Sequence, residues 1–453
     1  MAQPGGRFLT GSIMGHVVKM TLTGSFGVTF MFLVDAANLF WVSLLGNEQL
    51  ISALGFAWTI QFFSVSFGMG MMIAVTATVS RLIGRDERDE ARRQTMVCAI
   101  SAFLMQLAVA AFGLYYRHQI LAWAGATGET AALAARYLVF SMPSLPIMAL
   151  GMVGSAVLRA EGDAWRAMMV TMASGLVSMV IDPLLIYGLG LGLDGAALAV
   201  VASRVLSAVL SVWFVVGNHD LAGRINWQDF RRLFLPFLWV ATPAVLTQLS
   251  TPFGNYILTS VIAGFGDGAV AGWAVVSRLT VLAFGGLFAL SAAIGGIFGQ
   301  NYGALKFDRL RRAYRDALVF CLFYVLAAWA CLAAASPLVI VAFQLGDDAS
   351  EVIHAFTIIA AGSYVFTGAL FVANAAFNSL GRAVYSTVFN WARDGILILP
   401  LATALSGTFA AAGAIYGQAL AGVIVGTAAA LAGWVFVARL ERRHGVKPTS
   451  RTG

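Results

Sequence analysis

The sequence has 453 residues, of which 60% are hydrophobic and only 11% are charged. Soluble globular proteins carry about 25% charged residues, so this chain has too few to cover a water-facing surface of its size. The composition therefore argues against a soluble enzyme and against a nucleic-acid-binding protein, although the formal net charge is +7.

Twelve apolar runs follow one another along the chain, and each is long enough to cross a bilayer as a helix, which takes about 20 residues. The connections are short, and the runs lack the alternation of transmembrane strands. We therefore expect an all-α membrane protein with twelve transmembrane helices. The runs are residues 22–45, 50–80, 94–116, 131–158, 165–188, 194–216, 234–262, 269–299, 315–343, 351–378, 384–406 and 410–437.

Basic residues gather in the connections that follow even-numbered runs and at the two ends of the chain. These places hold 23 of the 28 Lys and Arg, whereas the odd-numbered connections hold only Arg117 and Arg136. This positive-inside pattern predicts that both termini lie in the cytoplasm. The excess of Arg over Lys, 25 to 3, favours a bacterial source, so we expect the protein in a bacterial inner membrane. It accounts for the positive charge without a nucleic-acid partner.

The chain also repeats itself, because glycines and charges in its first half recur in its second half at a nearly constant offset. The pattern predicts two parallel six-helix bundles, related by an axis along the membrane normal, as in transporters that work by alternating access. The predicted domains are an N-terminal lobe (1–216), a cytoplasmic linker (217–233), a C-terminal lobe (234–437) and a basic cytoplasmic tail (438–453). The matched residues are Gly84 with Gly303, Asp89 with Asp308, Arg92 with Arg311, Arg93 with Arg312, Gly162 with Gly381, Gly46 with Gly266, and Gly195-Ala196 with Gly413-Ala414.

Only three of the 21 acids lie well inside apolar runs: Asp35, Asp182 and Asp394. An acid at mid-bilayer costs on the order of 2.5–3.5 kcal/mol, so such residues are functional candidates. Asn38 shares a helix face with Asp35, and Ser178 shares one with Asp182. The alternative is that each Asp makes only a structural hydrogen bond to a neighbouring helix.

Asp394 directly follows Arg393 in the eleventh run, so a structural ion pair is the favoured interpretation there. Gln248, Asn255 and Tyr256 in the seventh run could line a cleft or could equally join helices by hydrogen bonds. The three cysteines have no paired spacing, and no catalytic motif stands beside a run. We therefore predict no metal, no cofactor and no enzymatic activity.

Eight segments carry a further signal: Val34-Asp35, Leu45-Gly46, Ser80-Arg-Leu-Ile-Gly84, Leu158-Arg-Ala-Glu-Gly-Asp163, Ile181-Asp182-Pro183, Leu193-Asp-Gly-Ala-Ala197, Gly299-Gln-Asn-Tyr-Gly-Ala304 and Arg393 to Pro400. Together they resemble the MATE (multidrug and toxic compound extrusion) family over nearly the full length of the chain. The resemblance implies twelve helices in two lobes and export of diverse, often cationic compounds in antiport with protons or sodium. In the DinF-like branch, acids in helices 1 and 5 form the coupling site, and Asp35 and Asp182 match those positions.

The function we expect is a monomeric antiporter that exports small-molecule drugs or metabolites in exchange for protons. Asp35, Asp182, Asn38 and Ser178 are its expected proton or cation coupling residues. Sodium coupling in the same fold is the nearest alternative, and a lipid-linked sugar flippase of the related superfamily is the next. The sequence does not identify the transported compound.

Overall fold

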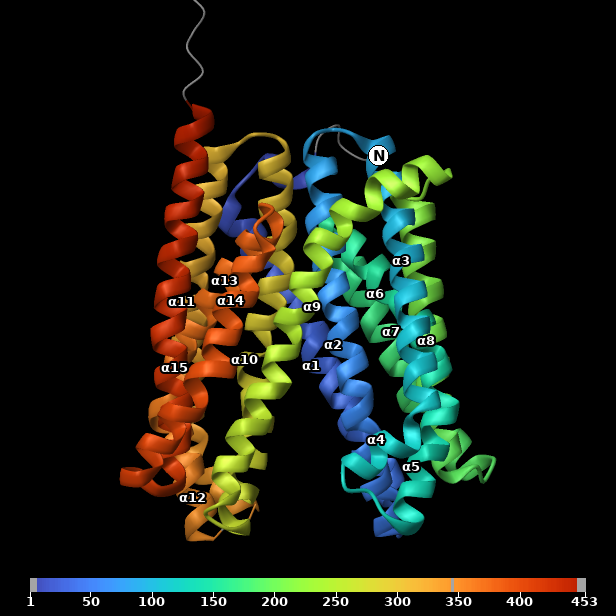
Figure 1. The fold of residues 1–453 in the computed structure, drawn as a ribbon, viewed down its shortest axis with the longest axis vertical. Helices are drawn as coiled ribbons and strands as arrows, with labels where there is room; N and C mark the ends of the chain where they lie inside the picture. Colours follow the sequence, from blue (N-terminus) through green and yellow to red (C-terminus); the bar gives the residue numbers. More distant parts are fainter. Residues whose placement is uncertain (1–5, 344–345, 446–453) are drawn as a thin grey trace, which may run out of the picture. The chain divides into compact units, whose positions relative to one another are not determined.

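The computed structural model describes residues 6–343 and 346–445, which form helices joined by short connections and contain no strand (Figure 1). Eleven of the described helical segments are long and apolar enough to cross a membrane. The last of them, Ala383–Arg442, holds two predicted spans, because the backbone leaves helical geometry at Phe409 and Ala410. The described residues therefore contain the twelve apolar helical segments that the sequence predicts.

Most helices extend beyond the apolar runs at one or both ends. The helix α1, for example, begins at Ile13 rather than at residue 22, and α9 begins at Trp227 rather than at residue 234. Backbone hydrogen bonding continues along a helix after it leaves the apolar layer, so hydropathy locates the span but not the helix end.

Two predicted spans are interrupted at corresponding places. Span 4 consists of α5, a 3-10 turn over Met142–Ser144, and α6. Span 10 consists of α12, a π-helix over Ala355–Ile359, a 3-10 turn over Ala360–Ser363, and α13. In span 4 the turn includes Pro143, which has no N–H to donate to the preceding turn.

The described residues fall into two compact units. Unit 1 comprises residues 26–79 and 87–245, and unit 2 comprises residues 6–25, 80–86, 246–343 and 346–445. The divisions fall inside α1, α2 and α9. The predicted boundaries of the lobes and the linker stay a prediction. In the predicted tail, residues 438–445 continue α15, and residues 446–453 lie outside the described residues.

The helices have the following bounds. Those that lie wholly or partly in unit 1 are α1 (Ile13–Ser43), α2 (Glu48–Gly84), α3 (Arg88–Tyr115), α4 (Arg117–Trp123), α5 (Gly128–Ser141), α6 (Leu145–Glu161), α7 (Ala164–Pro183), α8 (Gly192–Trp213) and α9 (Trp227–Ala263). Those of unit 2 are α10 (Asp267–Gly303), α11 (Phe307–Phe343), α12 (Asp347–His354), α13 (Tyr364–Ser379), α14 (Ala383–Trp391) and α15 (Ile398–Gly445).

Residues matched by the internal repeat adopt matched backbone conformations. Each pair below has positive φ in both members, which is uncommon for residues other than glycine. The repeated sequence therefore builds repeated turns between helices. The pairs are Gly46 (70°) with Gly266 (99°), Gly162 (92°) with Gly381 (84°), and Asp86 (63°) with Leu305 (57°).

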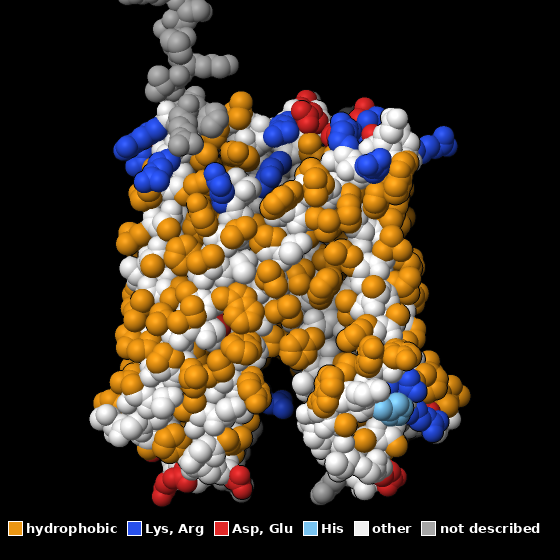
Figure 2. All heavy atoms as spheres, viewed as in Figure 1, with side chains coloured by type: hydrophobic (Ala, Val, Ile, Leu, Met, Phe, Trp, Pro, Cys, Tyr) orange, Lys and Arg blue, Asp and Glu red, His pale blue; other side chains and the backbone are white. Residues whose placement is uncertain are grey.

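Large apolar side chains cover the outer faces of the helices (Figure 2). Val180 on α7 is 69% exposed, and Leu338 on α11 is 72% exposed. In water such a surface would drive aggregation, whereas in a bilayer it contacts lipid. Together with the apolar helices, this surface identifies a multi-pass membrane protein.

Candidate functional site

Asp182 lies at the end of α7 in unit 1 and is fully buried. The next residue, Pro183, cannot donate a helical hydrogen bond, and the chain continues as a π-helix over Leu184–Gly188. The buried carboxylate therefore sits where the helix changes its hydrogen-bonding pattern.

Asn38 on α1 contacts this carboxylate and lies one helical turn after Asp35, the first predicted acid. The Nδ2 of Asn38 donates a hydrogen bond of 3.1 Å to Oδ2 of Asp182. The other oxygen, Oδ1, is buried and has no hydrogen-bond partner. Ser178 is buried one turn earlier on α7 and interacts with the same carboxyl group. Three of the four predicted coupling residues are thus in one place.

Asp35, the fourth, lies one helical turn before Asn38 and is half-buried. Among the residues that the structure describes, its side chain has no hydrogen bond and no ion pair. We call Asp35, Asn38, Ser178 and Asp182 the coupling cluster. Its role in coupling stays a prediction.

A glycine lets the two helices of this cluster approach closely. A Cβ added at Gly175 on α7 would lie 2.8 Å from the side chain of Val34 and 2.9 Å from the ring of Phe30, both on α1. Close approach through small residues is typical of membrane helices. It brings the amide of Asn38 within reach of Asp182.

Arg204 on α8 makes contacts that the sequence analysis missed. Its guanidinium donates hydrogen bonds to Gln61 Oε1 (2.6 Å), to Ser144 Oγ (2.8 Å) and to the carbonyl oxygen of Ser141 (2.9 Å). All three acceptors are uncharged, and no described carboxylate forms an ion pair with Arg204. This cation is held between α2, α5 and α8.

Tyr137 on α5 is a buried residue within electrostatic range of Arg204 and of the two acids. The side chain of Tyr137 is 4% exposed, and its phenol interacts electrostatically with Arg204. The same phenol interacts with Asp182 and Asp35. Unit 1 therefore contains one cation and two acids within electrostatic range of the same tyrosine. The sequence did contain one signal for this site, namely that Arg204 is a charged residue inside the sixth apolar run.

In unit 2, both carboxylate oxygens of Asp394 accept hydrogen bonds from neighbouring side chains. Arg393 binds both of its oxygens, through Nε at 2.7 Å and Nη2 at 2.9 Å, and the hydroxyl of Ser250 donates to Oδ2 at 2.9 Å. Asp394 is 3% exposed, and both charged residues lie in a π-helix over Ala392–Leu397. A paired and hydrogen-bonded charge of this kind is the expected form of a structural ion pair.

The polar residues of α9 differ in exposure. Gln248 is half-buried, whereas Asn255 is exposed and Tyr256 is 71% exposed. That these residues, Arg393 and Asp394 line a cleft stays a prediction. Within the described ranges, no group of three or more His, Cys, Asp or Glu could hold a metal ion.

The sequence profile of the MatE family matches residues 24–184 and 243–404 of this chain. The chain belongs to the MatE family. The two matched segments agree with the internal repeat, because each covers one half of the chain. Assignment to the DinF-like branch of the family stays a prediction.

Named relatives of this MatE chain are transporters. An FAD transporter from Shewanella oneidensis is 25% identical over 392 residues, which cover 85% of this chain and 86% of the relative. The multidrug export protein MepA from Staphylococcus aureus is 25% identical over 268 residues, 58% of this chain and 59% of MepA.

Solved structures share the MatE fold. The MATE transporter VcmN from Vibrio cholerae superposes with a TM-score of 0.90 at 22% identity, covering 96% of this chain and 98% of VcmN. A MOP-superfamily transporter from Pyrococcus furiosus superposes with a TM-score of 0.88 at 24% identity, covering 97% and 99%. At these identities the likeness establishes the fold.

Proposed function

We propose that this MatE protein exports organic compounds, often cationic, across the bacterial inner membrane in exchange for protons, and that it does so as a monomer. The observation that carries the proposal is the buried Asp182 carboxylate, which receives one amide hydrogen bond and keeps one oxygen without a partner. A charge so incompletely hydrogen-bonded is costly in a membrane interior. A proton removes that cost.

Proton exchange at the coupling cluster would then be linked to helix geometry. Asn38 donates to the charged carboxylate, so its hydrogen bond weakens when Asp182 is protonated. Loss of that bond would loosen α1 from α7 next to the π-helix. Two packings of these helices, selected by protonation, are the kind of two-state element that alternating access needs.

Arg204 favours protons over sodium as the coupling ion. With Asp35 and Asp182 both deprotonated, these two residues and Arg204 together carry a net charge of about −1 if Arg204 keeps its usual protonation. The guanidinium repels an added metal cation, whereas a proton is absorbed by forming a covalent O–H bond. A fixed cation in the same unit therefore does part of the charge compensation that a sodium ion would otherwise supply.

Everted membrane vesicles test the coupling residues. We expect a proton gradient to drive drug uptake by the wild type, and Asp35→Asn and Asp182→Asn each to lose it at least ~100-fold, the size of effect typical of a proton-transferring group. A sodium gradient with the proton gradient collapsed should drive none. Proton-driven uptake that survives in both variants would overturn the proposal, and sodium-driven uptake would select the sodium alternative.

Arg204 variants supply the second arm of the same experiment. Arg204→Gln removes the fixed cation, so the acids should release protons less readily and the transport optimum should move to higher pH. Arg204→Lys keeps the charge and should keep the optimum of the wild type. An unchanged pH profile in Arg204→Gln would contradict the role of Arg204.

A second candidate substrate class is a flavin dinucleotide. It is favoured by the length of the match to the FAD transporter, 85% of this chain against 58% for MepA. Overproducing cells should then release more FAD into the medium than cells producing the Asp182→Asn variant. Equal flavin release, together with drug efflux by the wild type alone, would select the multidrug function.

A further inference from the structure

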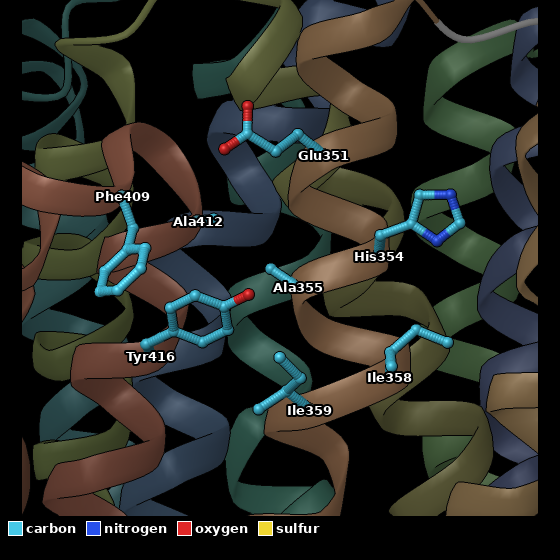
Figure 3. Close-up of a pocket in the computed structure, with 8 residues that line it drawn as sticks. All are labelled: Glu351, His354, Ala355, Ile358, Ile359, Phe409, Ala412 and Tyr416. Atoms are coloured by element: carbon cyan, nitrogen blue, oxygen red, sulfur yellow. The ribbon is translucent and has the colours of Figure 1, made fainter.

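Unit 2 contains a cavity of about 420 Å³ that no residue of the coupling cluster lines. Pockets for small organic molecules fall between about 300 and 1,000 Å³. Its walls are the segment from Glu351 to Ile359 in α12 and the following π-helix, and the kinked part of α15 (Figure 3). The lining residues are Glu351, His354, Ala355, Ile358, Ile359, Phe409, Ala412 and Tyr416.

One wall of this cavity carries a single carboxylate. Figure 3 shows Glu351, Ala355 and Ile359 on the side of their helix that faces the rings of Phe409 and Tyr416. No described Lys or Arg forms an ion pair with Glu351. His354 points away from the rings, and its Nδ1 lies 3.2 Å from the hydroxyl of Ser336. Glu351 is therefore the acid that a ligand would meet.

The opposite wall is aromatic. The rings of Phe409 and Tyr416 are edge to face, with centroids 5.6 Å apart and planes at 86°. Tyr416 and Glu351 line the same cavity, and the two groups interact electrostatically. Aromatic faces attract cations, and a nearby carboxylate adds to that attraction.

Further acids lie at the start of the same helix and of a neighbouring one. Asp347 and Asp348 form the first turn of the same helix, and Asp267 begins α10, where Gly268 lies beside Asp348. Figure 2 shows acidic side chains at this end of unit 2. Clustered charges of one sign raise the local concentration of oppositely charged ligands.

The aromatic wall is built by a strained backbone. Ala410 has φ 46° and ψ −134°, and Phe409 just before it leaves helical geometry. Residues other than glycine adopt such angles at a cost, and the strain is held by the surrounding structure, often at functional sites. Here the kink turns the ring of Phe409 against that of Tyr416.

We propose that this cavity binds organic cations with an apolar body, with the carboxylate of Glu351 at the cationic centre and the rings of Phe409 and Tyr416 against the apolar part. The site goes beyond the proposed function, because binding there needs neither transport nor the coupling cluster. The same chemistry is found in soluble cations and in the ammonium headgroup of phosphatidylethanolamine.

Equilibrium binding of radiolabelled tetraphenylphosphonium to the purified full-length protein in dodecyl maltoside tests the proposal. The protein carries Asp35→Asn and Asp182→Asn, so that failure of the proposed function leaves the test intact. Binding should persist in this background. Adding Glu351→Gln should weaken it about 5-fold or more, which corresponds to about 1 kcal/mol. Tyr416→Leu should weaken it about 3-fold or more, through loss of the cation–π contact.

The matched control is Asp308→Asn, which removes an exposed acid in the first turn of α11 that does not line the cavity. It should leave binding within about 2-fold of the background. Each variant is first checked for a single gel-filtration peak and an unchanged melting temperature. No binding in the background protein, or unweakened binding after Glu351→Gln, would overturn the proposal.

Added phosphatidylethanolamine identifies the source of the natural cation. If it displaces the phosphonium from protein with Glu351, the proposal stands with a lipid headgroup as the occupant. If it does not, the proposal stands with a soluble cation as the occupant.

Discussion

Two buried aspartates of this protein have opposite surroundings, and the difference assigns them opposite roles. Asp394 accepts three hydrogen bonds, two of them from the guanidinium of Arg393. Asp182 accepts a hydrogen bond from the neutral amide of Asn38, interacts with the neutral hydroxyl of Ser178, and keeps a buried oxygen without a partner. A carboxylate with a bidentate arginine gains little from a proton, whereas one whose only donors are neutral gains much. Asp182 is accordingly the better candidate for protonation.

A third aspartate, Asp163, joins two connections between helices in unit 1. Gly162 ends α6 in the left-handed conformation, and Asp163 then caps α7, accepting a hydrogen bond from the backbone N–H of Arg166 at 3.2 Å. The other oxygen lies 2.9 Å from Nε2 of His219, in the connection after α8. Burial alone would raise the pKa of the Asp163 carboxyl, but hydrogen bonds from His219 and Arg166 hold that pKa well below its usual range.

Asp163→Asn should therefore destabilise the protein in a pH-dependent way. At pH 7 we expect a loss of about 1–3 kcal/mol and a lower melting temperature, because buried partners lose a charged acceptor. A carboxyl whose pKa is lower in the folded state stabilises above its unfolded pKa of about 4, and that contribution disappears as the pH falls. The gap in melting temperature between wild type and variant should thus narrow from pH 5 to pH 3.

The control for this experiment is Asp89→Asn, since the Asp89 side chain is 81% exposed and pairs with Arg92 on the same helix. Exposed pairs contribute about 0–1 kcal/mol, so the control should melt close to the wild type. A gap between Asp163→Asn and wild type that stays constant down to pH 3 would contradict the assigned cause.

At the scale of elements, the helices depart from regular geometry beside the polar groups. The π-helix Leu184–Gly188 follows Asp182, and the π-helix Ala392–Leu397 contains Arg393 and Asp394. Single-turn π-helices inside longer helices occur frequently at functional sites. In the sequence, Pro183 indicates the π-helix after Asp182, but no comparable residue precedes the π-helix that contains Asp394.

The kink of α15 is the most strained of these departures. Ala410 has φ 46°, whereas Gly192, which precedes Ala410 by the same 218 residues that separate Gly195 from Gly413, has φ 54°. The first half of the chain thus uses glycine where the second half uses alanine. A residue other than glycine held at such a sparsely populated combination of φ and ψ costs roughly 1–3 kcal/mol.

We expect Ala410→Gly to raise the melting temperature in detergent, by about 1 kcal/mol in free energy of unfolding, because glycine adopts this backbone without strain. The matched control, Ala411→Gly, places glycine one residue later inside the helix and should cost about 1 kcal/mol. If Ala410→Gly melts no higher than Ala411→Gly, the strain at this residue is not relieved by removing Cβ.

At the scale of the whole molecule, the duplicated chain carries different chemistry in its two halves. The turns repeat, as the matched positive φ values of Gly162 and Gly381 indicate. The charges inside the spans do not repeat: unit 1 contains Asp35 and Asp182, which are incompletely hydrogen-bonded, whereas unit 2 contains the ion pair of Arg393 and Asp394. The two halves therefore share their turns between helices but differ in the charged residues of their interiors.

The sequence predicts the spans well, because a run of about 20 apolar residues is itself the requirement for crossing a bilayer. It also predicts that Asn38 and Ser178 accompany the acids, since helical spacing places residues three or four apart on one face. It does not predict the contacts of Arg204, which depend on how α2, α5 and α8 pack. Nor does it predict Tyr137, because one tyrosine in an apolar run resembles ordinary packing.

Orientation in the membrane follows from the distribution of Lys and Arg over the connections, and it predicts which connections water-soluble reagents reach. Two single-cysteine variants test it, in a protein whose Cys98, Cys321 and Cys331 are replaced by Ala. Glu129→Cys lies in the connection after the third span and should react with an impermeant thiol reagent in intact cells. Arg224→Cys lies in the connection after the sixth span and should react only after permeabilisation, because basic connections stay in the cytoplasm. The cysteine-free protein should not react in either case.

Labelling of Arg224→Cys, but not of Glu129→Cys, in intact cells would mean that the orientation is the reverse of the predicted one. Protons entering from outside would then reach Asp35 and Asp182 from the opposite face of the membrane.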